Sequence, residues 1–126
     1  MSRKEIIIEN AVSVGPYSQA IDSGELIFLS GQTPIDASTG KLVDTGIADQ
    51  TTQCFKNLLN VLNGAGLNFD DVVKVNVYLT DMNNFSEMNK VYADQFNKPY
   101  PARTTIAVAG LPLNANVEIE MIAKKR

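Results

Sequence analysis

The sequence contains no histidine and a single cysteine, Cys54, and these two features exclude several kinds of chemistry. Without histidine the chain can form neither a Ser-His-Asp triad nor the commonest type of zinc site. One cysteine cannot form a disulfide within the chain, so nothing in the sequence indicates secretion. No apolar run approaches the roughly 20 residues that a membrane-spanning helix needs. Any chemistry must therefore use carboxylates, arginine, lysine, tyrosine, cysteine or backbone groups.

Positive charge is also scarce away from the two ends of the sequence. Five of the 11 basic residues lie among the first four and the last three positions, and every acidic residue lies between Glu5 and Glu120. Because polyanion binding requires a basic surface, this acidic body disfavours a nucleic acid partner. The three consecutive isoleucines at 6–8 are too few for the core of a signal peptide. We therefore expect a cytoplasmic protein that does not contact membranes.

Length and periodicity predict a single domain over residues 1–126 that contains two helices. Residues 47–65 have an apolar stripe at helical spacing, and Cys54 on that stripe is expected to be a core thiol. Asp44 or Thr45 is expected to cap the start of this helix. The second helix is expected over residues 85–96.

Strands are expected at 6–8, 26–29, 72–80, 103–109 and 117–124, and residues 14–20 are expected to form a turn that leads into a further extended segment. In the third of these, the residues expected to face the core are Val73, Val75, Val77 and Leu79. The element order β-β-β-α-β-α-β-β predicts an α+β domain with both helices on one face of a single sheet. The other face is expected to be too apolar to stay in water, which predicts a homo-oligomer. Its expected residues are Val108, Val117, Ile119 and Met121, or their alternates.

The densest group of candidate functional residues lies near the C-terminal end of the sequence. Arg103 is the only arginine between Arg3 and Arg126, and it follows a proline at the start of an extended segment. A guanidinium there can hold a carboxylate or phosphate through two parallel hydrogen bonds, although a surface ion pair explains the pattern equally well. Glu118 and Glu120 share one face of the last strand, where repulsion could raise one pKa. The pattern alone favours a solvated polar face for them.

Four other residues are weaker candidates when the pattern alone is considered. Tyr17, Ser30 and Gly31 stand at strand ends, where binding sites are often built, and Asn89 lies on the second helix. A nucleophilic serine would need a lysine as its base, and no lysine is evidently placed for that role. The sequence has no phosphate-binding loop, no dinucleotide-binding glycine pattern and no zinc-ligand spacing.

These segments together resemble the RidA/YjgF family, the small reactive-intermediate deaminases. The matching segments cover nearly the whole chain, in order, and they are VGPYSQA (14–20), SGQTP (30–34), TG (39–40), Gln50, Asn57-Leu58, VVKVNVYLTDM (72–82), MNKVYADQF (88–96), PAR (101–103), LP (111–112) and VEIEMIA (117–123). The resemblance implies a chorismate-mutase-like fold, with a mixed sheet of about six strands and two helices on one face. It further implies a homotrimer with a central β-barrel and clefts between subunits.

The resemblance also implies an activity, which is hydrolysis of 2-aminoacrylate and related enamines and imines to 2-keto acids and ammonia. Arg103 matches the arginine that clamps the substrate carboxylate, and Glu118 matches the glutamate that positions or deprotonates the attacking water. The matching positions that line the pocket are Tyr17, Ser30, Gly31, Asn89 and Thr105. No metal or organic cofactor is required, and Glu120 is interpreted as structural.

Two departures from the family pattern and two rival functions remain open. Thr105 stands where the family often has cysteine, and Thr104 stands where a smaller residue is commoner. The first rival function is a non-catalytic regulator that binds a 2-keto acid through Arg103. The second is an endoribonuclease or translation inhibitor, which the acidic body and the absence of histidine disfavour.

Overall fold

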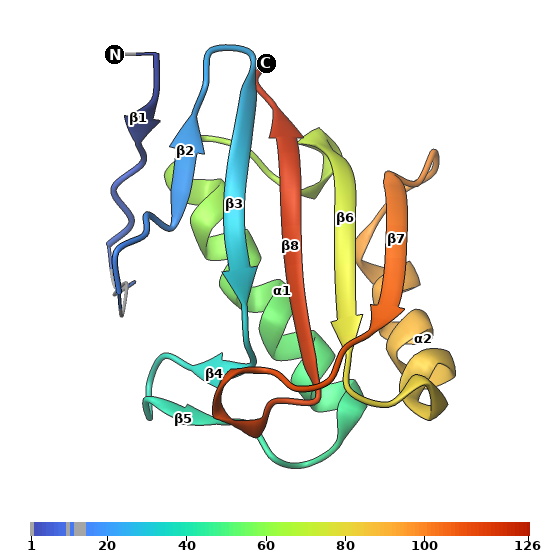
Figure 1. Ribbon diagram of the computed structural model, residues 1–126. Coiled ribbons are helices and arrows are strands. Elements are labelled where there is room, and N and C mark those ends of the chain that lie inside the picture. The colour runs from blue at the N-terminus through green and yellow to red at the C-terminus, as the bar shows by residue number, and fades with distance from the viewer. Residues whose placement is uncertain (1, 10, 12–14) are drawn as a thin grey trace.

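The computed structural model describes residues 2–9, 11 and 15–126, and its centre is a six-stranded sheet (Figure 1). In spatial order the strands are β1 (Lys4–Glu5), β2 (Ala20–Asp22), β3 (Leu26–Gln32), β8 (Val117–Lys124), β6 (Val72–Leu79) and β7 (Ala102–Ala107). Neighbouring strands are antiparallel, except that β6 and β7 are parallel and are therefore joined by a helical crossover. A separate hairpin is formed by β4 (Ile35–Asp36) and β5 (Lys41–Leu42).

Two helices, α1 (Ile47–Gly64) and α2 (Phe85–Gln95), lie on the same side of this sheet (Figure 1). They bury the alternate residues of the central strand β8, so that Val117, Ile119 and Met121 are at most 2% exposed. Three short 3₁₀ segments complete the fold, namely η1 (Phe69–Asp71), η2 (Met82–Asn84) and η3 (Pro112–Asn114). A mixed sheet with two helices on one side confirms the predicted α+β architecture.

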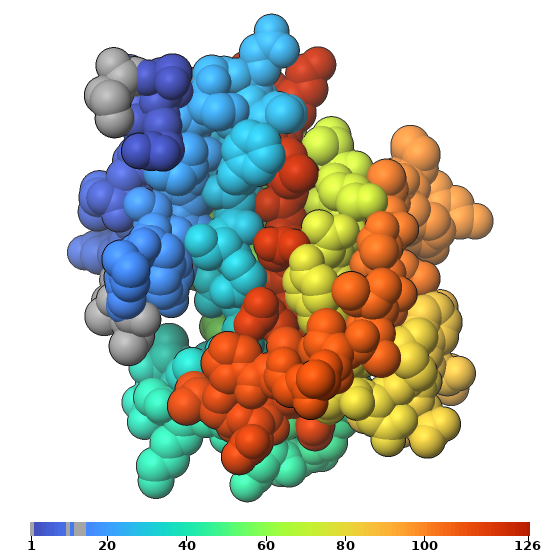
Figure 2. Space-filling view, viewed as in Figure 1, coloured from blue at the N-terminus to red at the C-terminus, as the bar shows by residue number. Residues whose placement is uncertain are grey.

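The other side of the sheet, hereafter the open face, is not covered by any helix of the described residues, and it is the side seen in Figure 2. Val117, Ile119 and Met121 point away from it, and their alternates Glu118 and Glu120 point onto it. Strand register places Phe28 and Ile106 on the open face as well, where they are 42% and 45% exposed. The open face therefore mixes carboxylates with apolar side chains instead of being uniformly apolar.

The first strand begins and ends earlier than expected, before the three isoleucines. β1 covers Lys4–Glu5, so the prediction of a strand at 6–8 is wrong. Ile8 is 8% exposed and packs over the end of α1, where a Cβ on Gly64 would lie only 2.4 Å from Ile8 Cδ1. Ile8 is thus buried against the helix, whereas Ile7 is 77% exposed.

Two other local predictions are wrong for identifiable reasons. The N-cap of α1 is Gly46 at φ 116°, which has no side chain to cap the helix, and the Thr45 hydroxyl donates to Asp49 Oδ2 at 2.6 Å. In β6 the pairing with β8 shifts between Val72 and Lys74. Val72 consequently enters the core, whereas Val73 is 43% exposed.

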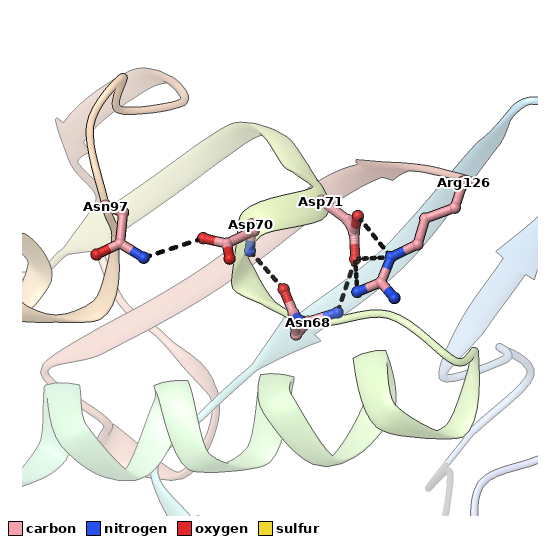
Figure 3. Close-up of polar contacts among 5 residues, drawn as sticks. All are labelled: Asn68, Asp70, Asp71, Asn97 and Arg126. Carbon is pink, nitrogen blue, oxygen red and sulfur yellow. Dashed lines mark hydrogen bonds and ion pairs between the residues drawn. The ribbon is translucent and has the colours of Figure 1, made fainter.

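A polar cluster fastens the C-terminal residue to η1 (Figure 3). Arg126 Nε and Nη2 both donate to Asp71 Oδ2, at 3.2 and 3.1 Å, and this contact lowers the pKa of Asp71. Asp71 also accepts from the backbone N–H of Asn68, and Asp70 accepts from Asn97 Nδ2 at 3.3 Å. The cluster fixes the end of β8 and the start of β6 relative to each other.

Candidate active site

Arg103 lies on β7 with its side chain on the helix-covered side of the sheet. Its register partner on β6, Val75, is fully buried there. Arg103 Nη1 donates to Asn89 Oδ1 at 2.6 Å, and its Cζ lies 4.5 Å from the centroid of the Tyr92 ring and 5.5 Å from that of Phe85. These three residues occupy one face of α2, so the guanidinium is held between a helix and an edge strand. Its orientation is fixed before any ligand binds.

Two buried hydroxyls belong to the same region. Tyr92 Oη and Thr105 Oγ1 have no hydrogen-bond partner among the described residues. Burial raises the pKa of Tyr92, and the nearby Arg103 charge opposes that rise. Thr105 is two residues beyond Arg103 on β7, so its side chain lies on the same side of the sheet. The region around Arg103 therefore contains two hydroxyl groups that form no hydrogen bond with the described residues.

Glu118 lies on the open face, where it faces Tyr78 of β6 across the strand pair. Pairing between β3 and β8 shifts between Leu29 and Gln32, which places Ser30 and Gly31 in an irregular stretch beside it. A Cβ on Gly31 would lie 2.6 Å from Glu118 Oε2, so the absent side chain makes room for the carboxylate. Burial, and then the charge of Glu120, raise the pKa of Glu118. Glu118 thus has the greater proton affinity expected of an acid–base group.

Ser30 and Tyr17 lie at the β3 side of the Glu118 region. Ser30 Oγ donates to the Ser18 carbonyl at 2.6 Å, and the Ser30 N–H donates to the Gln19 carbonyl at 2.9 Å. These bonds fasten the segment that carries Tyr17 to β3. Tyr17 itself is 47% exposed and lines a surface groove of about 320 Å³ with Ile7. Val14, the first residue of the motif that includes Tyr17, lies outside the described residues.

The predicted site residues therefore form two separate groups. The arginine group comprises Arg103, Asn89 and Thr105 on the helix-covered side, and the glutamate group comprises Glu118, Gly31 and Ser30 around the open face. Strand β6 lies between β7 and β8, so the sheet itself separates the two groups. One copy of the chain does not place Arg103 and Glu118 around the same small molecule.

Sequence reasoning missed four residues that contact these groups. Phe85 and Tyr92 stack on Arg103, and their spacing from Asn89 of four and three residues along α2 was a usable signal. Tyr78 and Asn76 donate to Glu120, and the alternation of β6 placed both on one face without showing which face this was. Within the described ranges, no group of three or more His, Cys, Asp or Glu residues could hold a metal ion. Neither of the two long helices is long and apolar enough to cross a membrane.

Comparisons with known proteins agree on a family for this sequence. The family described as Endoribonuclease L-PSP matches residues 8–125. A RutC family protein of Pyrococcus horikoshii is 49% identical, over 97% of this chain and 98% of its own length. The 2-iminobutanoate/2-iminopropanoate deaminase of Mus musculus is 44% identical, over 88% of this chain and 82% of its own.

A solved structure leads to the same conclusion. The crystal structure of RidA from an Antarctic Psychrobacter species superposes with a TM-score of 0.91 at 38% identity, covering 97% of this chain and 100% of that one. Sequence and fold thus agree over almost the full length, and the chain belongs to the RidA/YjgF family.

Proposed function

We propose that this protein hydrolyses 2-aminoacrylate and related enamines and imines to 2-keto acids and ammonia, at sites shared between copies of the chain in a homotrimer. The observation that carries this proposal is the placement of a pre-oriented Arg103 and a Glu118 of raised pKa on opposite sides of one sheet. In an imino acid the carboxylate carbon is bonded directly to the C=N carbon. Both residues must therefore reach a molecule a few ångströms long, which requires Arg103 from one copy and Glu118 from another.

Arg103 is suited to hold the carboxylate end of such a substrate. Its Nη1 is engaged by Asn89, which leaves other N–H groups of the fork free for a carboxylate. The rings of Tyr92 and Phe85 keep the guanidinium plane in place, so little rotamer entropy is lost on binding. Thr105 Oγ1 is a second donor on the same side.

Glu118 is suited to the proton transfers of imine hydrolysis. An enamine first becomes an imine when its C3 carbon gains a proton and its N–H loses one. The imine nitrogen takes up a proton from solvent, and Glu118 then takes a proton from water as the water oxygen attacks C2, which gives a neutral carbinolamine. Return of the proton from Glu118 to nitrogen lets the C–N bond break and ammonia leave, and the remaining hydroxyl gives its proton to solvent as the 2-keto acid forms. A carboxyl group whose pKa is raised toward the working pH can both accept and return a proton.

The open face supports the proposed association of copies. Phe28 and Ile106 are each more than two-fifths exposed on it, and contact with another copy would bury them. The activity that we carry to this chain is the one in the name of the mouse relative, a 2-iminobutanoate/2-iminopropanoate deaminase.

The first test is a competition assay with purified protein. An amino-acid oxidase generates the imine in the presence of semicarbazide, and the protein is expected to divert imine from the trap to 2-keto acid. Arg103→Ala and Glu118→Gln are each expected to abolish the diversion, and Arg126→Ala serves as a control for loss of an arginine away from either group. A wild-type protein that leaves semicarbazone formation unchanged would contradict the proposed activity.

Mixing the two inactive variants tests whether sites are shared between copies. If each site takes Arg103 from one subunit and Glu118 from another, co-refolded Arg103→Ala and Glu118→Gln chains form some sites with both native residues. Random assembly from equal amounts restores about a quarter of the wild-type sites. A mixture that stays inactive, although it assembles, would place both residues within one subunit.

A second candidate function is a regulator that binds its ligand through Arg103 but does not hydrolyse imines. A regulator that binds 2-keto acids needs the pre-oriented Arg103 and does not need Glu118. It predicts that wild type leaves the trap unaffected, that a 2-keto acid binds, and that only Arg103→Ala abolishes binding. The endoribonuclease in the family description ranks third because the chain has no histidine and an acidic body. RNA cleavage that persists through purification and is lost in Glu118→Gln would raise that rank.

A further inference from the structure

A second carboxylate lies beside Glu118 and is held by neutral hydrogen-bond donors. Glu120 Oε1 accepts hydrogen bonds from the Tyr78 hydroxyl and from Asn76 Nδ2, the latter at 3.2 Å. Both donors are on β6, where Asn76 is the register partner of Glu120 and Tyr78 is the partner of Glu118. Glu120 and Glu118 are two residues apart on one face of β8, which separates their Cα atoms by roughly 7 Å. The two carboxylates and their donors thus form one network on the open face.

No cation of the described chain neutralises this pair. The ion pairs among the described residues join Lys125 to Asp22 and Arg126 to Asp71. Lys74, which lies further along the open face, donates to Thr104 instead. The two donors directed at Glu120 Oε1, an amide and a phenol, carry no positive charge.

The groups that face Glu118 from each neighbouring element can be named. β8 contributes Glu120, and β6 contributes Tyr78. β3 contributes the neutral Ser30 and Gly31. On the other side of the sheet, α1 contributes Cys54. Burial, and then the charge of Glu118, raise the pKa of this thiol, so it stays neutral. Glu120 is consequently the one charged group of the described chain that acts on Glu118 at close range.

We propose that Glu120 is a positioning residue for Glu118: Tyr78 and Asn76 fix its carboxyl group beside Glu118 on the open face, where it acts on the proton transfers that Glu118 carries out. This inference rests on the imine hydrolysis proposed above, which it deepens. It replaces the interpretation of Glu120 as a purely structural residue.

The directions of the pKa shifts of Glu118 and Tyr78 support this role. The pKa of Glu118 is raised first by burial and then by Glu120. The pKa of Tyr78 is raised to about 12, chiefly by its hydrogen bond to Glu120, so the phenol keeps its proton and remains a donor at neutral pH. Because the two carboxylates are coupled, loss of charge at Glu120 must make Glu118 easier to ionise.

The decisive test titrates Glu118 directly, by ¹³C NMR of the glutamate side-chain carboxyls in the assembled protein. Glu118→Gln identifies the Glu118 signal by removing it. Glu120→Gln, which preserves shape and hydrogen bonding but removes the charge, is expected to move the Glu118 midpoint to lower pH. Tyr78→Phe is expected to shift it in the same direction by less, and Glu120→Asp, which keeps the charge, is expected to leave it higher than Glu120→Gln does.

Kinetics give the second readout. In Glu120→Gln, the acid limb of the kcat/KM profile for the imine is expected to move to lower pH in step with the NMR midpoint, with a several-fold loss of kcat at neutral pH. Arg103→Ala is titrated alongside, so that any effect of an arginine from a neighbouring copy is measured separately.

Each outcome decides one point. An unchanged Glu118 midpoint in Glu120→Gln, or equal shifts in Glu120→Gln and Glu120→Asp, would overturn the role of Glu120. If no imine is hydrolysed but the midpoint shifts as expected, the electrostatic coupling stands and the proposed function fails. If the imine is hydrolysed and the midpoint does not shift, the proposed function stands and this inference fails.

Discussion

The two faces of the sheet differ in how completely their side chains are buried. On the helix-covered face, the alternate residues of β8, from Val117 to Ala123, are at most 2% exposed, and they pack within a single apolar core. On the open face, the intervening residues of the same strand are half-buried, and the two carboxylates there form no ion pair with any described residue. Strand β8 therefore contributes its buried apolar residues to the core and its alternate residues, Glu118 and Glu120, to the candidate site.

The candidate site residues follow this division in an instructive way. Arg103 is held by Asn89, Phe85 and Tyr92 at the edge of the covered face, so its orientation is determined inside one chain. Glu118 occupies space that is available only because Gly31 has no side chain. The covered face should accordingly be sensitive to atoms that are removed, and the open face to atoms that are added.

The largest expected effect comes from removing atoms on the covered face. Ile119→Ala leaves a cavity in the core and is expected to cost about 2–5 kcal/mol in the free energy of unfolding. Ile122→Ala, on the open side of the same strand, is expected to cost clearly less and to weaken association between copies instead. Urea unfolding and analytical ultracentrifugation of both variants measure the two effects. Equal unfolding costs at the two positions would contradict the distinction between the faces.

The next effect comes from adding one carbon to the open face. Gly31→Ala places a Cβ 2.6 Å from Glu118 Oε2, so the carboxylate must rotate away. Because the clash is with the end of a flexible side chain, the thermal midpoint should change little. Displacement of a catalytic group by an ångström can cost on the order of 100-fold in rate, and a loss of that size in imine hydrolysis is expected. Gly110→Ala, which adds a Cβ where no atom lies within 4 Å, is the matched control. Full activity in Gly31→Ala would show that the cramped contact does not position Glu118.

The smallest effect comes from a polar contact that belongs to neither face. The bond to Arg126 lowers the pKa of Asp71, so this pair stabilises the folded state above the ordinary pKa of aspartate. That contribution is lost as the pH falls through the lowered pKa. Asp71→Asn is therefore expected to unfold at slightly lower urea concentration than wild type at neutral pH, with the difference vanishing in acid and shrinking in high salt. A difference that persists in acid would assign the effect to packing.

Much of this fold could be predicted because its signals are periodic and local. The alternation of Glu118 and Glu120 with Val117, Ile119 and Met121 was readable, and so was the apolar stripe of α1 through Cys54. The same alternation fits a strand whose helices cover either side. Which set is buried depends on where α1 packs, and this is a tertiary property. The side on which Arg103 lies was hidden for the same reason, since it depends on the register between β6 and β7.

Irregular positions limited the prediction elsewhere. The register shift at Val73 breaks the regular alternation of β6, and the positive φ of Gly46 replaces the usual side-chain cap of α1. Both features depend on neighbouring elements, which the local sequence does not show. For the site, the resemblance to a family selected the relevant residues from a longer set of weak candidates. Their partition between two sides of the sheet needed the structure.

The order of the strands has a consequence for how the protein is made. β8, which lies between β3 and β6, follows all the other strands in the sequence. Until it is synthesised, β3 and β6 each present an unpaired edge, and the sheet consists of two disconnected parts. The pairing of β3 with β8 joins residues about 90 positions apart, so the contact that completes the sheet is among the most distant in the chain. During translation these two edges therefore stay unpaired until β8 has left the ribosome.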